Sequence, residues 1–136
     1  MAHDHQLQFV RTVSRHLSNS WDNKSILEIG AYDVNGSIRS FFPNSSYLGV
    51  DLVEGPGVDL VCEGDKVALP TESVDLSVSC ECFEHNPNWL STFENMYRMT
   101  RKGGALVITC ASTGRIEHGT ARTSPTSSPG TQSIGW

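Results

Sequence analysis

Four acidic side chains occur where short apolar stretches of the sequence end: Glu28, Asp51, Asp65 and Glu81. Asp51 follows Glu28 by 23 residues, close to the interval of about 20 residues at which a carboxylate meets ribose in nucleotide-binding folds. A carboxylate accepts two hydrogen bonds from a vicinal diol, and a second carboxylate can accept from an exocyclic amine. The spacing therefore predicts a nucleoside-type ligand, with Asp51 at the ribose and Asp65 at an adenine amine.

The residues beside these acids complete the predicted cofactor-binding set. Gly30 lets the backbone turn sharply and approach a ligand closely. Glu28 has two interpretations, an anchor for loop amides or a partner for a cationic part of the ligand, and the alternative role of Asp51 and Asp65 is to cap turns. The remaining members of the set are Ala31, Tyr32, Leu52, Gly64, Lys66 and Cys80.

One histidine qualifies as the catalytic base. His85 comes just after the apolar stretch 74–79 and beside Glu84, and an imidazole titrates near neutral pH. The alternative is that Glu84 and His85 cap the following helix and fix the loop. His118 lies in a polar C-terminal segment and is interpreted as an exposed side chain.

The four cysteines lie within or beside apolar stretches, at positions 62, 80, 82 and 110. Buried free thiols in a reducing compartment explain them most simply. Cys80, Cys82 and His85 offer metal-binding atoms, but the sequence has no second ligand pair at the spacing of zinc sites. We therefore expect no metal site.

A regular alternation of strands and helices must position these residues. Apolar stretches predict strands at about 25–29, 47–51, 58–62, 74–79 and 105–110, and periodic or capped stretches predict helices at 5–18, 35–42 and from 86 or 88 to 100. Strands that are apolar on both faces and separated by helices are typical of a parallel sheet covered on both sides. The expected fold class is α/β, a Rossmann-like and mostly parallel sheet, whose ligands bind at the carboxyl ends of the strands.

The composition changes after residue 111. Residues 112–136 are rich in Ser, Thr, Gly and Pro and lack apolar periodicity. We expect one domain over 1–111, which begins with the helix at 5–18, and a polar tail or loop over 112–136 that is extended or disordered.

The totals exclude several classes of protein. The 136 residues carry a net charge of −5 and their apolar runs are only a few residues long, far below the roughly 20 residues needed to span a bilayer. The N-terminus has no apolar signal-peptide core, which favours a cytoplasmic protein. The ten Lys and Arg residues are scattered, which disfavours nucleic acid as a substrate.

Several stretches in this order resemble the class I S-adenosylmethionine (SAM)-dependent methyltransferases, specifically their UbiE-like small-molecule group. The similar stretches are 26–30, 48–51, 64–70, 73–79, the pair Glu84-His85, and 101–106. The resemblance covers about residues 25–110. It implies SAM as the cofactor, with Asp51 on its ribose and Asp65 on its adenine, and a small-molecule methyl acceptor.

Two departures from the family keep alternatives open. Gly30 is followed by Ala31-Tyr32-Asp33, so the second glycine of the usual Gly-x-Gly loop is missing. No pair of strands is predicted after Cys110, where a full family member continues, and the unpaired sheet edge allows a homo-oligomer. One alternative is a SAM-binding but catalytically incomplete or partner-dependent domain. Another, an NAD-dependent dehydrogenase, is weakened by the absence of Gly-x-Gly-x-x-Gly.

Overall fold

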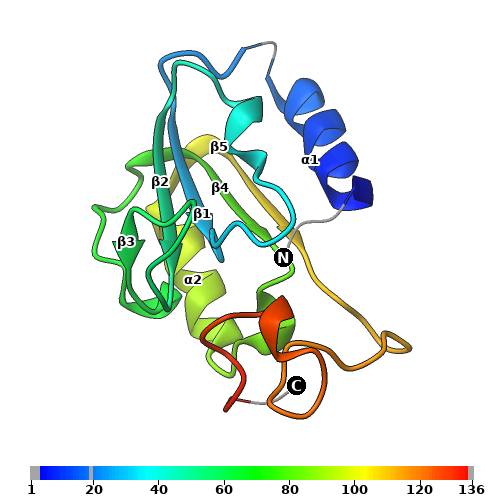
Figure 1. Cartoon of the computed structure of the whole chain (residues 1–136). Helices are drawn as coiled ribbons and strands as arrows, with labels where there is room; N and C mark the ends of the chain where they lie inside the picture. The colour runs from blue at the N-terminus through cyan, green and yellow to red at the C-terminus, as the bar shows by residue number, and fades with distance from the viewer. Residues whose placement is uncertain (1–3, 19, 135–136) are drawn as a thin grey trace.

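A parallel sheet forms the centre of the protein (Figure 1). The computed structural model describes residues 4–18 and 20–134. Within these residues the sheet has five strands in the order β3-β2-β1-β4-β5, all paired in parallel. Their bounds are Ser25–Ile29 (β1), Ser46–Asp51 (β2), Leu60–Val61 (β3), Val74–Cys80 (β4) and Thr100–Thr109 (β5). This architecture confirms the predicted Rossmann-like α/β class.

The strand order reverses between β1 and β4. The chain runs outward from β1 through β2 to β3, then returns to place β4 on the other side of β1. Ile29 at the end of β1 lies beside Val50 of β2 and Ser79 of β4, so three strands end at one level. Parallel sheets bind ligands outside such a reversal point, because the loops diverge there and leave a crevice.

The two long helices cover opposite faces of the sheet (Figure 1). Helix α1 (Asp4–Leu17) contributes Val10 to a core that includes Ile26, whereas α2 (Trp89–Met99) contributes Met96 to a second core that includes Leu27. Neighbouring residues of β1 thus enter different cores, as the alternation of side chains along a strand requires. The first helix begins and ends within a residue of the predicted 5–18.

Two elements are shorter than the sequence predicts. The stretch 35–42 forms only a short 3-10 helix, η1 (Ile38–Phe41), and β3 is two residues long because it pairs only with Val50 and Asp51 at the sheet edge. Helix α2 ends at Met99, within a residue of the predicted end at 100, and Thr100 already pairs with Val74 of β4. Gly103 and Gly104 lie within β5, where Gly103 has a positive φ of 75°.

The C-terminal segment runs from Cys110 across the carboxyl ends of the strands (Figure 1). It contains turns and one short 3-10 helix, η4 (Pro125–Ser127), and its backbone closes on itself through a hydrogen bond from Ala121 N to Gln132 O. Thr120 and Thr131 are buried. The division of the chain at residue 111 stays a prediction.

The cysteines are free thiols of unequal exposure. Cys80 is buried, and burial raises the pKa of Cys80 and Cys82 to about 12, so that both thiols stay protonated. Cys110, predicted to be buried, is exposed because it follows the last residue of β5. Among the described residues no helix is both long and apolar enough to cross a membrane.

Candidate functional site

A cavity of about 310 Å³ opens at the carboxyl ends of β1 and β2. Its walls come from five parts of the chain. These are the end of β1 with Gly30, the end of β2 with Asp51, the segment 62–65 with Asp65, the segment after β4 with Glu81, and the C-terminal segment with Ser128. The site therefore lies where the strand order reverses, as expected for a parallel sheet.

Gly30 forms the sharp turn at the end of β1. Its φ is 84°, and a Cβ atom there would lie 2.6 Å from Cβ of Cys82. Both the conformation and the space thus require glycine. The backbone N–H groups of Gly30 and Ala31 both donate to the carbonyl of Val50, at 2.9 and 3.1 Å, which fixes the loop against β2.

Ala31 stands where the family's second glycine is missing. Its side chain is buried and does not line the cavity. It lies against Gly49 of β2, where an added Cβ would be 2.9 Å from the methyl of Ala31. The methyl group of Ala31 therefore does not narrow the cavity, because it occupies the space beside Gly49, which has no side chain.

Asp51 presents a carboxylate that the backbone holds in place. Its Oδ2 accepts from the N–H of Tyr32 at 2.9 Å, and its Oδ1 accepts from the N–H of Leu52 at 2.7 Å. Burial raises the pKa of Asp51 and these N–H groups lower it, with a net increase. The N–H of Val53 lowers the pKa in the same direction. A carboxylate has about four acceptor sites, so the group can still accept from a ligand.

Asp65 lies on η2 (Gly64–Lys66), on another wall of the cavity. Its Oδ2 is 2.8 Å from Nζ of Lys66, whose side chain is exposed and does not line the cavity. Gly64 packs so tightly that an added Cβ would lie 2.6 Å from Cγ2 of Thr92 on α2. Helix α2 thereby sets the position of Asp65.

Glu81 and His85 line the side of the cavity that follows β4. Glu81 is buried and has a φ of 52°, a left-handed conformation that non-glycine residues rarely adopt and that is common at functional sites. Burial, with a smaller effect of His118, lowers the pKa of His85 to about 4. Its imidazole is therefore neutral at pH 7 and has a lone pair that can accept a proton.

Comparison with known proteins identifies the family. A family described as "Methyltransferase domain" matches residues 39–108, which is half of the chain. The protein belongs to this methyltransferase domain family. None of the curated protein sequences matches the chain.

Solved structures similar to this methyltransferase domain support the same fold. A proposed methyltransferase from an antibiotic biosynthesis pathway of Anabaena variabilis is 22% identical, with a TM-score of 0.61 over 80% of this chain and 47% of its own. The 1,6-didemethyltoxoflavin-N1-methyltransferase of Burkholderia thailandensis, solved with its named substrate and S-adenosylhomocysteine, is 18% identical, with a TM-score of 0.55 over 70% of this chain and 47% of its own. The chain spans about half the length of these two proteins.

A third similar structure is phosphoethanolamine N-methyltransferase 2 of Haemonchus contortus, in complex with phosphomonomethylethanolamine and S-adenosylhomocysteine. It is 20% identical, with a TM-score of 0.63 over 85% of this chain and 30% of that one. At these identities the likeness concerns the fold, which agrees with the sheet described above.

Glu28 was predicted to bind the cofactor, but its side chain lies on the other face of the sheet of the methyltransferase domain. It does not line the cavity, because alternation along β1 directs it to the face that η1 covers, the face of Ile26. There the hydroxyl of Tyr47 donates to Glu28 Oε2 at 2.6 Å. Burial raises the pKa of Glu28 to about 7, against the opposing effects of Tyr47 and Arg39. Asp51, Asp65 and Glu81 thus share one cavity without Glu28.

The other predicted site residues also fall into two groups, those that line the cavity and those that do not. Cys80 faces the α1 side of the sheet and does not line the cavity, like Ala31 and Lys66. The lining residues that were predicted are Gly30, Tyr32, Asp51, Leu52, Gly64, Asp65, Glu81 and His85. Alternation along β1 and β4 turns Glu28 and Cys80 away from the cavity, whereas Ala31 lies in the loop after β1 and Lys66 on η2.

Sequence reasoning missed the wall supplied by the C-terminal segment. Ser127, Ser128, Pro129, Thr131 and Ile134 line the cavity, although the segment has no apolar periodicity. Its abundance of Ser, Thr and Pro is typical of a loop and carries no sign of a partner. His118, predicted to be exposed, is half-buried with its ring centroid 5.0 Å from that of His85.

Proposed function

We propose that this methyltransferase domain binds SAM in the cavity and transfers its methyl group to a small-molecule acceptor. The observation that carries the proposal is the carboxylate of Asp51, which backbone N–H groups hold at the cavity wall and which can still accept hydrogen bonds. A rigid pair of acceptors suits the vicinal hydroxyls of a ribose. The cavity of about 310 Å³ also falls within the usual range of small-molecule sites.

The charge of the cavity supports a cationic ligand. Asp51, Glu63, Asp65 and Glu81 all line it. SAM combines a positively charged sulfonium, an amino group, two ribose hydroxyls and an adenine amine, all of which favour anionic or acceptor groups. We assign Asp51 to the ribose, Asp65 to the adenine amine and Glu81 to the cationic end of the ligand.

The chemistry asks the protein mainly to align the reactants and exclude water. SAM, when bound, supplies a methyl group that is already activated by the positive charge on sulfur. The tight turn at Gly30 and the wall that includes Ser128 enclose the space in which the acceptor and the methyl group must align. We assign His85 the role of base, because its imidazole lines the cavity and is neutral at pH 7; its pKa of about 4 makes it a weaker base than the near-neutral titration expected from the sequence.

Two of the similar structures support a small-molecule acceptor. The structures from Burkholderia thailandensis and Haemonchus contortus carry small molecules, according to their descriptions. We extend this class of acceptor, the UbiE-like group and a cytoplasmic location to the present chain as proposals. A catalytically incomplete or partner-dependent SAM-binding domain is the second candidate, because the chain spans about half the length of the first relatives.

Self-association is a further part of the proposal. Among the described residues β5 pairs with β4 alone, so its other edge is open to a second copy. Helix α2 also exposes four large apolar side chains, Trp89, Leu90, Phe93 and Tyr97. Sedimentation velocity of the wild-type chain and of Tyr97→Glu tests this proposal, and a concentration-independent monomer contradicts it.

Calorimetric titration with SAM, S-adenosylhomocysteine and NAD tests the proposed function. We expect binding of the first two and no binding of NAD. Binding of NAD alone would instead favour a dehydrogenase. Turnover with a panel of small hydroxyl and amine acceptors then separates an active methyltransferase from a domain that binds SAM without catalysis.

A further inference from the structure

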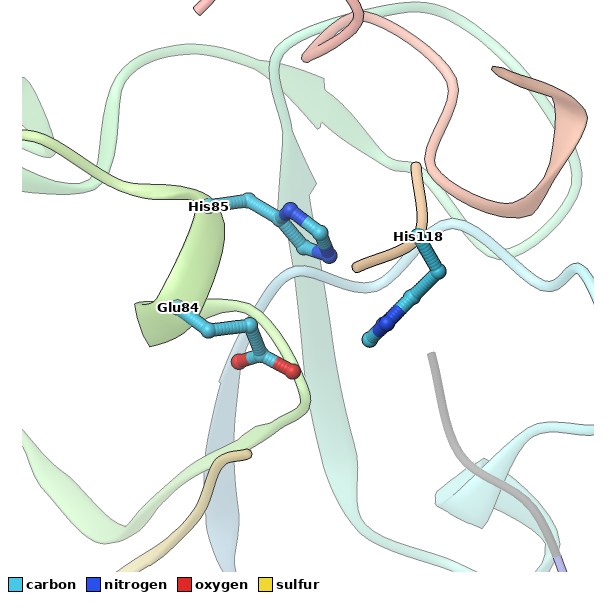
Figure 2. A group of neighbouring side chains, drawn as sticks. All are labelled: Glu84, His85 and His118. Atoms are coloured by element: carbon cyan, nitrogen blue, oxygen red, sulfur yellow. The ribbon is translucent and has the colours of Figure 1, made fainter. Parts of the chain in front are cut away.

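Three side chains that can bind metal converge beside the cavity (Figure 2). Glu84 and His85 come from η3 (Phe83–His85), and His118 comes from the C-terminal segment. One ligand atom from each residue lies within 4.8 Å of the other two. His85 also lines the cavity, whereas Glu84 and His118 do not. We call these three residues the Glu84–His85–His118 cluster.

The chemistry of the donors suits a divalent transition-metal ion. Two imidazoles and one carboxylate form a common ligand set for Zn²⁺ and related ions, whereas Mg²⁺ prefers oxygen ligands. Bonds of about 2.0–2.1 Å to Zn²⁺ place tetrahedral ligand atoms about 3.3 Å apart. Small side-chain rotations would therefore close the cluster around an ion and leave a fourth position for water.

Glu84 supplies a buried carboxylate that is only partly compensated. Both of its oxygens are buried, and neither accepts a hydrogen bond of normal geometry from the described residues. Burial is the largest effect that raises the pKa of Glu84, Glu81 adds to it, and the backbone N–H groups of Glu84 and Ala111 oppose it. A buried anion of this kind is costly unless a cation or a donor pairs with it.

His118 is oriented as a metal-binding histidine usually is. Its Nδ1 lies 3.1 Å from the carbonyl oxygen of Ile116, so that a proton on Nδ1 is donated to the backbone and Nε2 keeps its lone pair. Such a hydrogen bond from the outer nitrogen fixes the tautomer and the ring orientation of histidine ligands. The rings of His85 and His118 are nearly perpendicular, at 88°.

The backbone beside His118 approaches His85 closely. Gly119 has a φ of 69°, and a Cβ atom there would lie 2.9 Å from Cε1 of His85 and 2.5 Å from Cβ of Ser128. Glycine at this position lets the C-terminal segment reach the cluster. Ser128, from the same segment, lines the cavity. Whatever binds the cluster therefore also holds this wall of the cavity.

We propose that Glu84, His85 and His118 bind one divalent ion of the zinc class, and that the ion fastens the C-terminal segment to η3. The site departs from the expectation of no metal. That expectation relied on ligand spacing in the sequence, and only the fold brings His118 beside Glu84 and His85. The inference stands independently of SAM binding, but it replaces the role of base assigned to His85, because an imidazole that binds an ion has no lone pair left for a proton.

Calorimetric titration of the full chain with Zn²⁺ alone tests the proposal. All proteins carry His3→Ala, His5→Ala and Cys110→Ser, which remove two imidazoles near the N-terminus and an exposed thiol. We expect one Zn²⁺ per chain and at least tenfold weaker binding in both His118→Ala and Glu84→Gln. His16→Ala is the matched control, because His16 is exposed on α1, and it should bind Zn²⁺ as before.

Limited proteolysis tests whether the ion holds the C-terminal segment against η3. Trypsin cleaves after Arg115 and Arg122, which are exposed and flank His118. Without SAM, Zn²⁺ should slow both cleavages several-fold in the parent protein and leave the rates in His118→Ala unchanged.

Three results would overturn the inference: no Zn²⁺ binding by the folded chain, undiminished binding in folded His118→Ala, or a preference for Mg²⁺ over Zn²⁺. A parallel SAM titration keeps the two proposals apart. Failure of Zn²⁺ binding with intact SAM binding rejects the metal site alone.

Discussion

At the scale of single residues, we expect ligand binding to depend most on Asp51. Its carboxylate accepts from Tyr32 and Leu52 and faces the cavity. Without this carboxylate, the ligand loses hydrogen bonds to a charged group. We expect Asp51→Ala to weaken SAM binding by about 1–3 kcal/mol, measured by calorimetric titration.

Two further variants make the Asp51 test specific. Asp51→Asn keeps the size of the side chain but replaces one acceptor oxygen with a donor, so it should also weaken binding. Asp22→Ala removes an exposed aspartate far from the cavity lining and should bind SAM normally. Unchanged affinity in a folded Asp51→Ala protein contradicts the ribose contact.

Glu28 makes a separate prediction about stability and pH. Its pKa is raised from 4.5 to about 7 in the folded protein, so the folded state binds the proton more tightly than the unfolded state does. The stability due to this difference is fully present below pH 4.5 and is lost as pH rises through about 7. Linkage gives a loss of about 3 kcal/mol at most.

Glu28→Gln should abolish this part of the pH dependence, because glutamine stays neutral and can still accept from Tyr47. The free energy of unfolding, measured by urea denaturation at intervals from acid to mildly alkaline pH, should fall less steeply in the variant. Glu54→Gln changes an exposed glutamate and is the control. Parallel curves for wild type and Glu28→Gln would show that Glu28 does not titrate in this range.

At the scale of elements, the contact between η2 and α2 positions one wall of the cavity. A Cβ at Gly64 would lie 2.6 Å from Cγ2 of Thr92 and 3.0 Å from Cγ2 of Ile29. We expect Gly64→Ala to lower the free energy of unfolding by about 1–3 kcal/mol through overpacking. It should also weaken SAM binding, because Asp65 moves with η2.

A second substitution tests this packing explanation. Thr92→Ser removes the crowded methyl group but keeps the hydroxyl that accepts from Nδ2 of Asn86. The double variant Gly64→Ala/Thr92→Ser should therefore recover part of the lost stability in thermal or urea unfolding. If the two substitutions are simply additive, steric conflict between η2 and α2 is not the cause.

At the scale of the whole molecule, the C-terminal segment completes a site that the sheet begins. Ser128 and Thr131 line the same cavity as Asp51. A ligand that binds both parts should hold the segment closed, because binding stabilises the conformations that make the contacts. We expect saturating SAM, in the presence of a chelator, to slow tryptic cleavage after Arg115 and Arg122 several-fold.

Mass spectrometry of the fragments over time measures the two cleavage rates. Asp51→Ala, which should bind SAM poorly, is the control and should show little protection at the same SAM concentration. Equal rates with and without SAM in the wild-type chain would mean that the C-terminal segment is not part of the SAM site.

The sequence by itself determined the strands and the class of fold. Contiguous apolar runs locate β1, β2 and β4, and glycine or aspartate at their ends identifies Gly30 and Asp51. These features depend on neighbours in the chain, so a local pattern suffices to predict them. The resemblance to methyltransferases rested on the same local stretches, and the match over 39–108 confirms the methyltransferase family, while the UbiE-like group stays a prediction.

Only the tertiary structure decided which side chains meet. Alternation within the paired sheet turned Glu28 away from the cavity, toward Tyr47, although it stands beside the other strand-end residues in sequence. The return of the C-terminal segment brought Ser128 to the cavity and His118 to His85. Such contacts depend on register and on the packing of distant segments, and a polar loop carries no periodic pattern from which they could be read.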